Sequence, residues 1–180
     1  GVFKHLLQVQ VPWKQVHIFM IDERCVSLNS LECNYRMAYN TFIKELIDSK
    51  KIPKENVHPF LYDPENAPSS IKKYDQSLNE LERKFDIILV SSGEDGHIGA
   101  LFPKHNSVIS ENTTFFYINN APKLPAKRMT APRKLLQTAK VGVILFFGSK
   151  KQQAFENFSK PETKIVDCPA KLISTLPEYF

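Results

Sequence analysis

The sequence predicts an α/β fold: a mostly parallel open sheet with helices on both faces, Rossmann-like, in a single domain. Two observations lead to this prediction. Short runs of consecutive apolar residues, typical of strands buried on both faces, alternate with longer segments whose apolar residues recur at helical spacing. The length of 180 residues suits one domain with a sizeable core.

The apolar runs predict the strands. Residues 141–147 form the strongest run, with seven residues that are apolar or glycine. Pro59 favours an edge position for its own strand, because proline has no N–H to donate to a neighbour. In chain order, the expected strands are residues 16–21, 56–61, 86–90, 115–118, 141–147 and a short last one at 164–166.

Two longer segments repeat apolar residues at helical spacing and are predicted to be amphipathic helices. The stripe begins at Leu31 in residues 31–48 and at Ile71 in residues 69–84. Short polar residues before each helix are the expected N-caps. The expected caps are Ser30 or Asn29 for the first helix and Ser69 or Ser70 for the second. Two shorter helices are predicted at residues 132–139 and 150–158.

Composition and charge indicate which kinds of ligand or partner the protein can bind. The net charge is +5, but the lysines are scattered, which predicts a small anionic ligand and neither a nucleic acid nor a membrane. No apolar run approaches the ~20 residues that a membrane span needs. Cys25, Cys33 and Cys168 are odd in number and widely spaced, so we expect free thiols in a reducing compartment, the cytoplasm, and no metal site.

Polar clusters follow three of the predicted strands. They are Asp22-Glu23-Arg24, the segment 91–97 and Gly148-Ser149-Lys150. In an open parallel sheet, ligands bind in the crevice at the carboxyl ends of the strands. We therefore expect the three clusters to converge on one site.

The segment 91–97 contains the strongest candidate for chemistry. His97 can act as a general base near neutral pH. Gly93 and Gly96 let backbone N–H groups approach an anionic ligand closely. Asp95 is expected to orient or polarise these neighbouring groups.

Three cations are candidates for holding a phosphate or carboxylate: Arg24, Arg128 and Lys150. Arginine offers a planar fork of donors, whereas lysine offers a point charge. Asp22 lies next to Arg24 in the chain and is a candidate for the same site.

Taken in order, these stretches resemble the 6-phosphogluconolactonases, a family that shares a superfamily with glucosamine-6-phosphate deaminases and ribose-5-phosphate isomerases. The match covers nearly the whole chain and is specific in its combination of motifs. The stretches that carry it are Trp13, Asp22-Glu23-Arg24, Cys33-Asn34-Tyr35-Arg36-Met37, Ser91 to Pro103, Pro122 to Thr130, Gly148 to Lys151 and Pro169-Ala170.

The resemblance implies hydrolysis of 6-phosphoglucono-1,5-lactone to 6-phosphogluconate in the pentose phosphate pathway, with neither a metal nor an organic cofactor. It implies that His97 is the general base and that Asp22 positions polar groups of the substrate or water. Arg24, Arg128 and one lysine would hold the phosphate and stabilise the oxyanion. Either Lys150 or Lys151 matches the family lysine.

The chain also departs from the family pattern. Ile98 follows the histidine as it does in the deaminases, so a glucosamine-6-phosphate deaminase or related sugar-phosphate isomerase is an alternative. The family's Ser-Gly-Gly-Ser-Thr-Pro phosphate loop is absent from residues 1–180. We expect the chain to be one 6-phosphogluconolactonase-like domain without its N-terminal strand and phosphate loop. A catalytically inactive sugar-phosphate-binding module is the third alternative. Fusion to glucose-6-phosphate dehydrogenase, as in apicomplexan parasites, is a further expectation.

Overall fold

The computed structural model describes residues 2–180 and confirms the α/β class, with the strands distributed over three small sheets. Three of the five strand pairs are parallel. The sheets have the orders β1-β3 (parallel), β4-β7-β8 (parallel) and β2-β6-β5 (antiparallel). The bounds are β1 Ile18–Phe19, β2 Asp22–Arg24, β3 Val57–His58, β4 Ile87–Ser91, β5 Phe116–Ile118, β6 Arg128–Thr130, β7 Val141–Leu145 and β8 Glu178–Tyr179.

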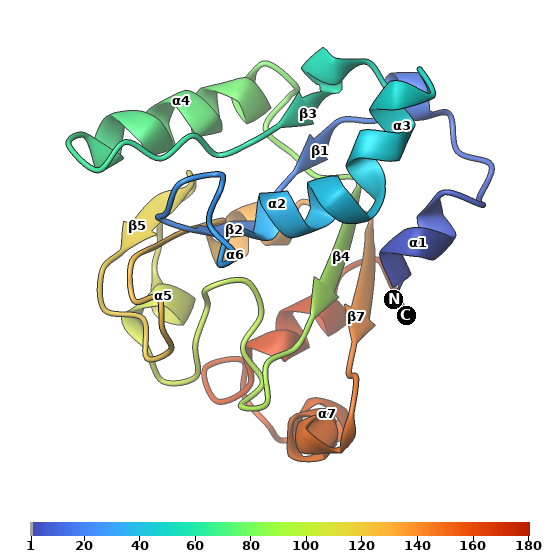
Figure 1. Cartoon of the computed structure of the whole chain (residues 1–180). Coiled ribbons are helices and arrows are strands. Elements are labelled where there is room, and N and C mark those ends of the chain that lie inside the picture. The colour runs from blue at the N-terminus through green and yellow to red at the C-terminus, as the bar shows by residue number, and fades with distance from the viewer. Residues whose placement is uncertain (1) are drawn as a thin grey trace.

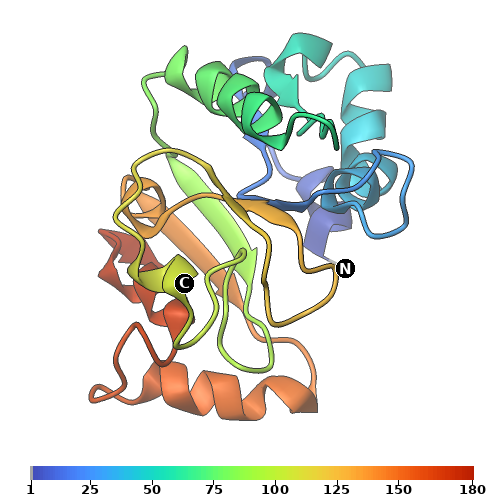
Figure 2. The same cartoon turned by 90° about the vertical axis from the view of Figure 1, so that its left-hand side faces the viewer.

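Helices cover both ends of this arrangement. In Figure 1, β1 and β3 lie between α4 and the helix formed by α2 and α3, whereas β4 and β7 run side by side below them. Figure 2 shows α2, α3 and α4 in the upper half and α7 along the lower edge. The bounds are α1 Val2–Leu6, α2 Asn34–Ala38, a π-helical turn at Tyr39–Ile43, α3 Lys44–Asp48, α4 Ala67–Asn79, α5 Asn106–Ile109, α6 Arg133–Leu136 and α7 Gln152–Ser159; 3-10 turns are η1 Trp13–Gln15, η3 Lys54–Asn56, η4 Ser149–Lys151 and η5 Pro169–Thr175.

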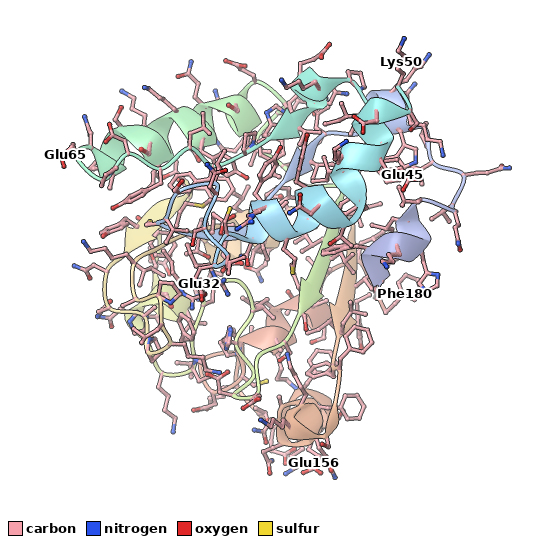
Figure 3. The ribbon with its side chains drawn as sticks, in the orientation of Figure 1. Glu32, Glu45, Lys50, Glu65, Glu156 and Phe180 are labelled. Atoms are coloured by element: carbon pink, nitrogen blue, oxygen red, sulfur yellow. The ribbon has the colours of Figure 1, made fainter. Side chains whose placement is uncertain are left out.

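The apolar side chains form two main clusters. One contains Ile88 and Ile144 from β4 and β7 and extends to η5. The other contains Trp13, Phe42 and Leu46 and fills the space between α1, the α2–α3 helix and β1. Charged side chains lie at the periphery, as Figure 3 shows for Glu32, Glu45, Lys50, Glu65 and Glu156.

The first long helix starts later than its apolar pattern predicts. It begins at Asn34, and Leu31 is 89% exposed. The N-cap is Cys33, whose sulfur accepts a hydrogen bond from the N–H of Arg36. A buried carboxylate, that of Glu23, holds the first helical N–H groups and so sets where the helix starts.

The second long helix, α4, matches its predicted core face. Ile71, Tyr74 and Leu78 are buried. Its N-cap is Asn66, whose side chain accepts a hydrogen bond from the N–H of Ser69. The helix therefore starts before the serines that the sequence pattern favours, and such a cap is worth about 1 kcal/mol.

Several short elements differ from the predictions. Residues 164–166 form a turn and not a strand. The elements β2, β6, β8, α5 and η5 were not predicted, and Asp22-Glu23-Arg24, expected just after a strand, itself forms β2. β6 escapes a search for apolar runs because Arg128 and Thr130 are polar, although all three of its residues are buried.

Candidate active site

The turn that follows β4 is closed by hydrogen bonds between its own backbone groups. The N–H of Gly93 donates to the carbonyl of His97 at 2.7 Å, and the N–H of Gly96 donates to the carbonyl of Gly93 at 3.1 Å. Gly96 has φ +86°, a left-handed conformation that favours glycine. The two glycines therefore shape the turn. Their N–H groups are already used and do not form the anion-binding nest that their sequence pattern favours.

The imidazole of His97 lies directly on the backbone of Gly93. A Cβ atom at Gly93 would lie 2.0 Å from Nδ1 and 2.1 Å from Cε1 of the ring. Only a glycine leaves room for the ring in this position. The same ring packs against Phe102 with 4.7 Å between centroids, so it is held from two sides.

Asp95 fixes the histidine through a hydrogen bond. Its Oδ1 lies 2.6 Å from Nδ1 of His97 and 3.2 Å from Nζ of Lys123. Burial raises the pKa of Asp95, but the hydrogen bonds and positive charges of His97 and Lys123 outweigh it and lower the pKa well below its ordinary value. Asp95 is therefore an anion at neutral pH and orients the ring.

β2 supplies the acidic and basic groups opposite this turn. Side chains alternate along a strand, so Asp22 and Arg24 share one face while Glu23 points to the other. Glu23 is 1% exposed. Its carboxylate accepts hydrogen bonds from the N–H groups of Asn34 (2.8 Å), Tyr35 (2.7 Å) and Arg24 (2.8 Å). Glu23 thus ties β2 to the start of α2.

Asp22 sits among cations. Its Oδ2 lies 3.7 Å from Nη1 of Arg128, which is on the neighbouring strand β6. Burial raises the pKa of Asp22, and the charges of Arg24, Arg128 and His97 oppose this. The carbonyl of Asp22 also accepts a hydrogen bond from Nδ2 of Asn34 at 3.1 Å.

The two arginines differ in how far their donors are already used. Arg128 is 4% exposed, and its Nε and Nη2 donate to the carbonyls of Pro125, Lys123 and Leu124. Arg24 donates from Nη1 to the carbonyl of Glu32 at 2.7 Å. Its buried Nε has no hydrogen-bond partner among residues 2–180. Arg24 is therefore the arginine with more capacity for a ligand.

Of the two adjacent lysines, the structure brings Lys151 to the β4 end. Nζ of Lys151 donates to the carbonyl of Ser92 and lies 3.4 Å from Oγ of Ser91. Lys150 is exposed and forms no ion pair among the described residues. Both lysines lie in the turn η4, whose N-cap is Gly148 with φ +84°.

One hollow of about 740 Å³ joins some of these groups. Its polar end is lined by Asp22, Arg24, His97 and Arg128. Its other end is apolar and lies between β1 and β4. Two of the three predicted polar clusters therefore converge, the segment 91–97 through Ser91 and His97. The residues of the predicted site that do not line this hollow are Gly93, Asp95, Gly96 and Lys150, and Gly148 and Lys151 do not line it either.

Pattern reading missed two residues at or near the site, Asn34 and Lys123, and it left open whether Lys150 or Lys151 lies at the β4 end. Asn34 lines the hollow. Both missed residues lie in motifs quoted above, but neither follows a predicted strand directly. No group of histidine, cysteine, aspartate and glutamate side chains that could hold a metal occurs among residues 2–180. None of the helices described there is long and apolar enough to span a membrane.

Comparison with known sequences assigns the chain to a protein family. Residues 1–178 match the family described as glucosamine-6-phosphate isomerases/6-phosphogluconolactonase. A 6-phosphogluconolactonase of Borreliella burgdorferi is 36% identical over 174 residues, covering 97% of this chain and 74% of the relative. A 6-phosphogluconolactonase of Synechocystis is 30% identical, covering 99% of this chain and 75% of the relative.

Solved structures agree on the fold. The crystal structure of a 6-phosphogluconolactonase from Thermotoga maritima superposes with a TM-score of 0.80 at 23% identity, covering 99% of this chain and 77% of that one. A monomeric glucosamine-6-phosphate deaminase superposes with a TM-score of 0.77 at 16% identity, covering 99% and 76%. The fold is thus common to lactonase and deaminase. The chain belongs to the glucosamine-6-phosphate isomerase/6-phosphogluconolactonase family.

Proposed function

We propose that this protein hydrolyses 6-phosphoglucono-1,5-lactone to 6-phosphogluconate, with His97 as the general base. Relatives named 6-phosphogluconolactonase that match almost the whole chain support this activity. The observation that supports the role of His97 is the 2.6 Å contact between its Nδ1 and the Asp95 carboxylate, in a ring that lines the hollow.

That contact selects the tautomer of the base. An ionised carboxylate can only accept, so Nδ1 carries the proton and donates it to Asp95. Nε2 is then the basic nitrogen. A histidine oriented in this way can take a proton from a water molecule, and a positioned base contributes roughly 10²–10⁴-fold to rate.

The reaction then proceeds in two steps. Water attacks the lactone carbonyl as Nε2 of His97 takes its proton, which gives a tetrahedral oxyanion and an imidazolium. Collapse of the oxyanion breaks the bond from the carbonyl carbon to the ring oxygen, and the imidazolium returns the proton to that oxygen. The product is the open-chain 6-phosphogluconic acid, which ionises.

Charged groups in and near the hollow are assigned to binding the substrate and stabilising the oxyanion. Arg24 lines the hollow, and its guanidinium suits the developing oxyanion or the phosphate of the substrate. Asp22, held between Arg24 and Arg128, positions polar groups of the substrate or the attacking water. Lys151, and not Lys150, is the lysine we assign to electrostatic stabilisation at the β4 end.

The expectation that a first strand and a phosphate-binding loop complete this site stays a prediction. It is supported by the edges of β1 and β4, which each pair on one side only among the described residues and flank the apolar end of the hollow. Activity is therefore measured on the complete natural chain.

The test compares wild type with His97→Ala and with His5→Ala, which removes an exposed histidine of α1. Lactone hydrolysis is followed by coupling 6-phosphogluconate to its dehydrogenase. We expect His97→Ala to lose about 10²-fold or more in kcat and His5→Ala to lose nothing. Equal activity in wild type and His97→Ala would refute the role of His97.

A second arm tests the deaminase alternative, which the histidine-isoleucine pair at residues 97–98 favours. Release of ammonia from glucosamine 6-phosphate, with no lactone hydrolysis, would replace the proposed activity by that one.

A further inference from the structure

Asp95 is shared between two basic groups. Its Oδ1 contacts Nδ1 of His97 at 2.6 Å and Nζ of Lys123 at 3.2 Å. The ammonium group is thus within about 6 Å of the imidazole, with the carboxylate oxygen between them. Among the described residues, Asp95 is the only ion-pair partner of Lys123.

Lys123 reaches this position because its loop is anchored from inside. The segment between β5 and β6 passes over the buried guanidinium of Arg128, which binds the carbonyls of Lys123, Leu124 and Pro125 at 3.0–3.2 Å. The loop is closed by a hydrogen bond from the N–H of Ala121 to the carbonyl of Ala126. The backbone of Lys123 is therefore fixed, although its side chain is 41% exposed.

We propose that Lys123 is a positioning residue that acts on His97 through Asp95. This proposal rests on the proposed general base. Lys123 holds the carboxylate in the orientation that binds Nδ1. Its positive charge also balances the negative charge of Asp95. Without that balance, the carboxylate would stabilise the protonated imidazolium of His97, which cannot act as a base.

The charged groups around the imidazole come from several elements. Asp95 lies on its own turn, Asp22 on β2, Arg128 on β6 and Lys123 on the loop before β6. Arg24 adds a second cation beside Asp22. Removing Lys123 leaves two carboxylates facing the ring and takes away one cation, so the ring holds its proton up to a higher pH.

The experiment uses Lys123→Met, Lys123→Arg and Lys127→Met in the complete chain. Lys127 is exposed on the same loop and pairs with no acid among the described residues, so its loss controls for net charge. Titration of the His97 ring is followed by NMR of its Cε1–H signal, assigned by its absence in His97→Ala. This readout does not depend on any enzymatic activity.

We expect the midpoint of this titration to rise by about 0.5–1 pH unit in Lys123→Met, a screened interaction between partly exposed charges. Lys123→Arg and Lys127→Met should leave it at the wild-type value. The acid limb of kcat/KM should move by the same amount, with KM at pH 8 unchanged.

An unchanged midpoint in Lys123→Met, or an equal rise in Lys127→Met, would overturn the proposal. A raised KM at every pH with an unchanged midpoint would also overturn it, because Lys123 would then bind the substrate directly. If no lactone hydrolysis occurs at all but the midpoint moves as expected, the coupling of Lys123 to His97 stands and the proposed function fails.

Discussion

Gly93→Ala is the sharpest test of how the turn holds the imidazole. The new methyl group would lie 2.0 Å from Nδ1 of His97 and 2.6 Å from Oδ1 of Asp95. Ordinary contacts between such atoms are no shorter than about 3.4 Å. The ring must therefore move by more than about 1 Å and the carboxylate by somewhat less, and the 2.6 Å hydrogen bond between them breaks.

The size of the effect follows from this displacement. A misplacement of about 1 Å in a reacting group can cost about 10²-fold, and loss of the positioned base costs roughly 10²–10⁴-fold. We expect kcat to fall about 10²- to 10³-fold. Gly93 does not have a positive φ, so alanine adds no backbone strain. Stability should fall by only about 1 kcal/mol, for one partly exposed hydrogen bond.

The assay pairs kcat with urea unfolding and uses Gly142→Ala as the matched control. A methyl group at Gly142, in β7, would lie 2.6 Å from Ile173 and 2.7 Å from Leu176, away from the imidazole. Such overpacking costs about 1–3 kcal/mol. We expect Gly142→Ala to lose stability and keep kcat, the reverse of Gly93→Ala. A Gly93→Ala protein whose kcat stays within about threefold of wild type would refute the reasoning.

Two further predictions concern stability. Glu23→Ala leaves the N–H groups of Asn34 and Tyr35 without their buried acceptor, so the free energy of unfolding in urea should fall by about 2–4 kcal/mol; a loss below about 0.5 kcal/mol would contradict this network. Burial, with a smaller effect of His17, lowers the pKa of His58 to about 4. Because an unfolded histidine titrates near 6.5, this group's contribution is fully present above that pH and is lost between about pH 6.5 and 4. After allowance for screening of the partly exposed ring, wild type should lose about 1 kcal/mol more than His58→Gln between pH 7 and 5, and parallel stability–pH curves would disprove it.

Local patterns predicted the parts of the fold that depend on local physics. The stripe of Ile71, Tyr74 and Leu78 on α4 is buried, because helical spacing alone places these residues on one face. β7 lies within its predicted apolar run, and β4 overlaps its own run at residues 87–90 and continues one residue further, to Ser91, for the same kind of reason. Helix starts failed, because distant groups compete with local caps: the carboxylate of Glu23 sets the start of α2.

The site shows the same division. A histidine between glycines, and an arginine beside an aspartate, are visible in the sequence, and the structure brings His97, Asp22, Arg24 and Arg128 to one hollow. The sequence did not show which hydrogen-bond or ion-pair partner each of these groups has. The N–H groups of Gly93 and Gly96 donate to carbonyls within the turn, and Lys151, not Lys150, lies at the end of β4.

The sequence by itself determined the α/β class and the family and named His97 as the candidate base, because these depend on residue type and spacing along the chain. Only the tertiary structure decided which partners each charge acquires. The ion pairs of Lys123 with Asp95 and of Arg128 with Asp22 join segments that are distant in sequence. Such contacts depend on strand register and loop closure, and these are settled by packing of the whole chain.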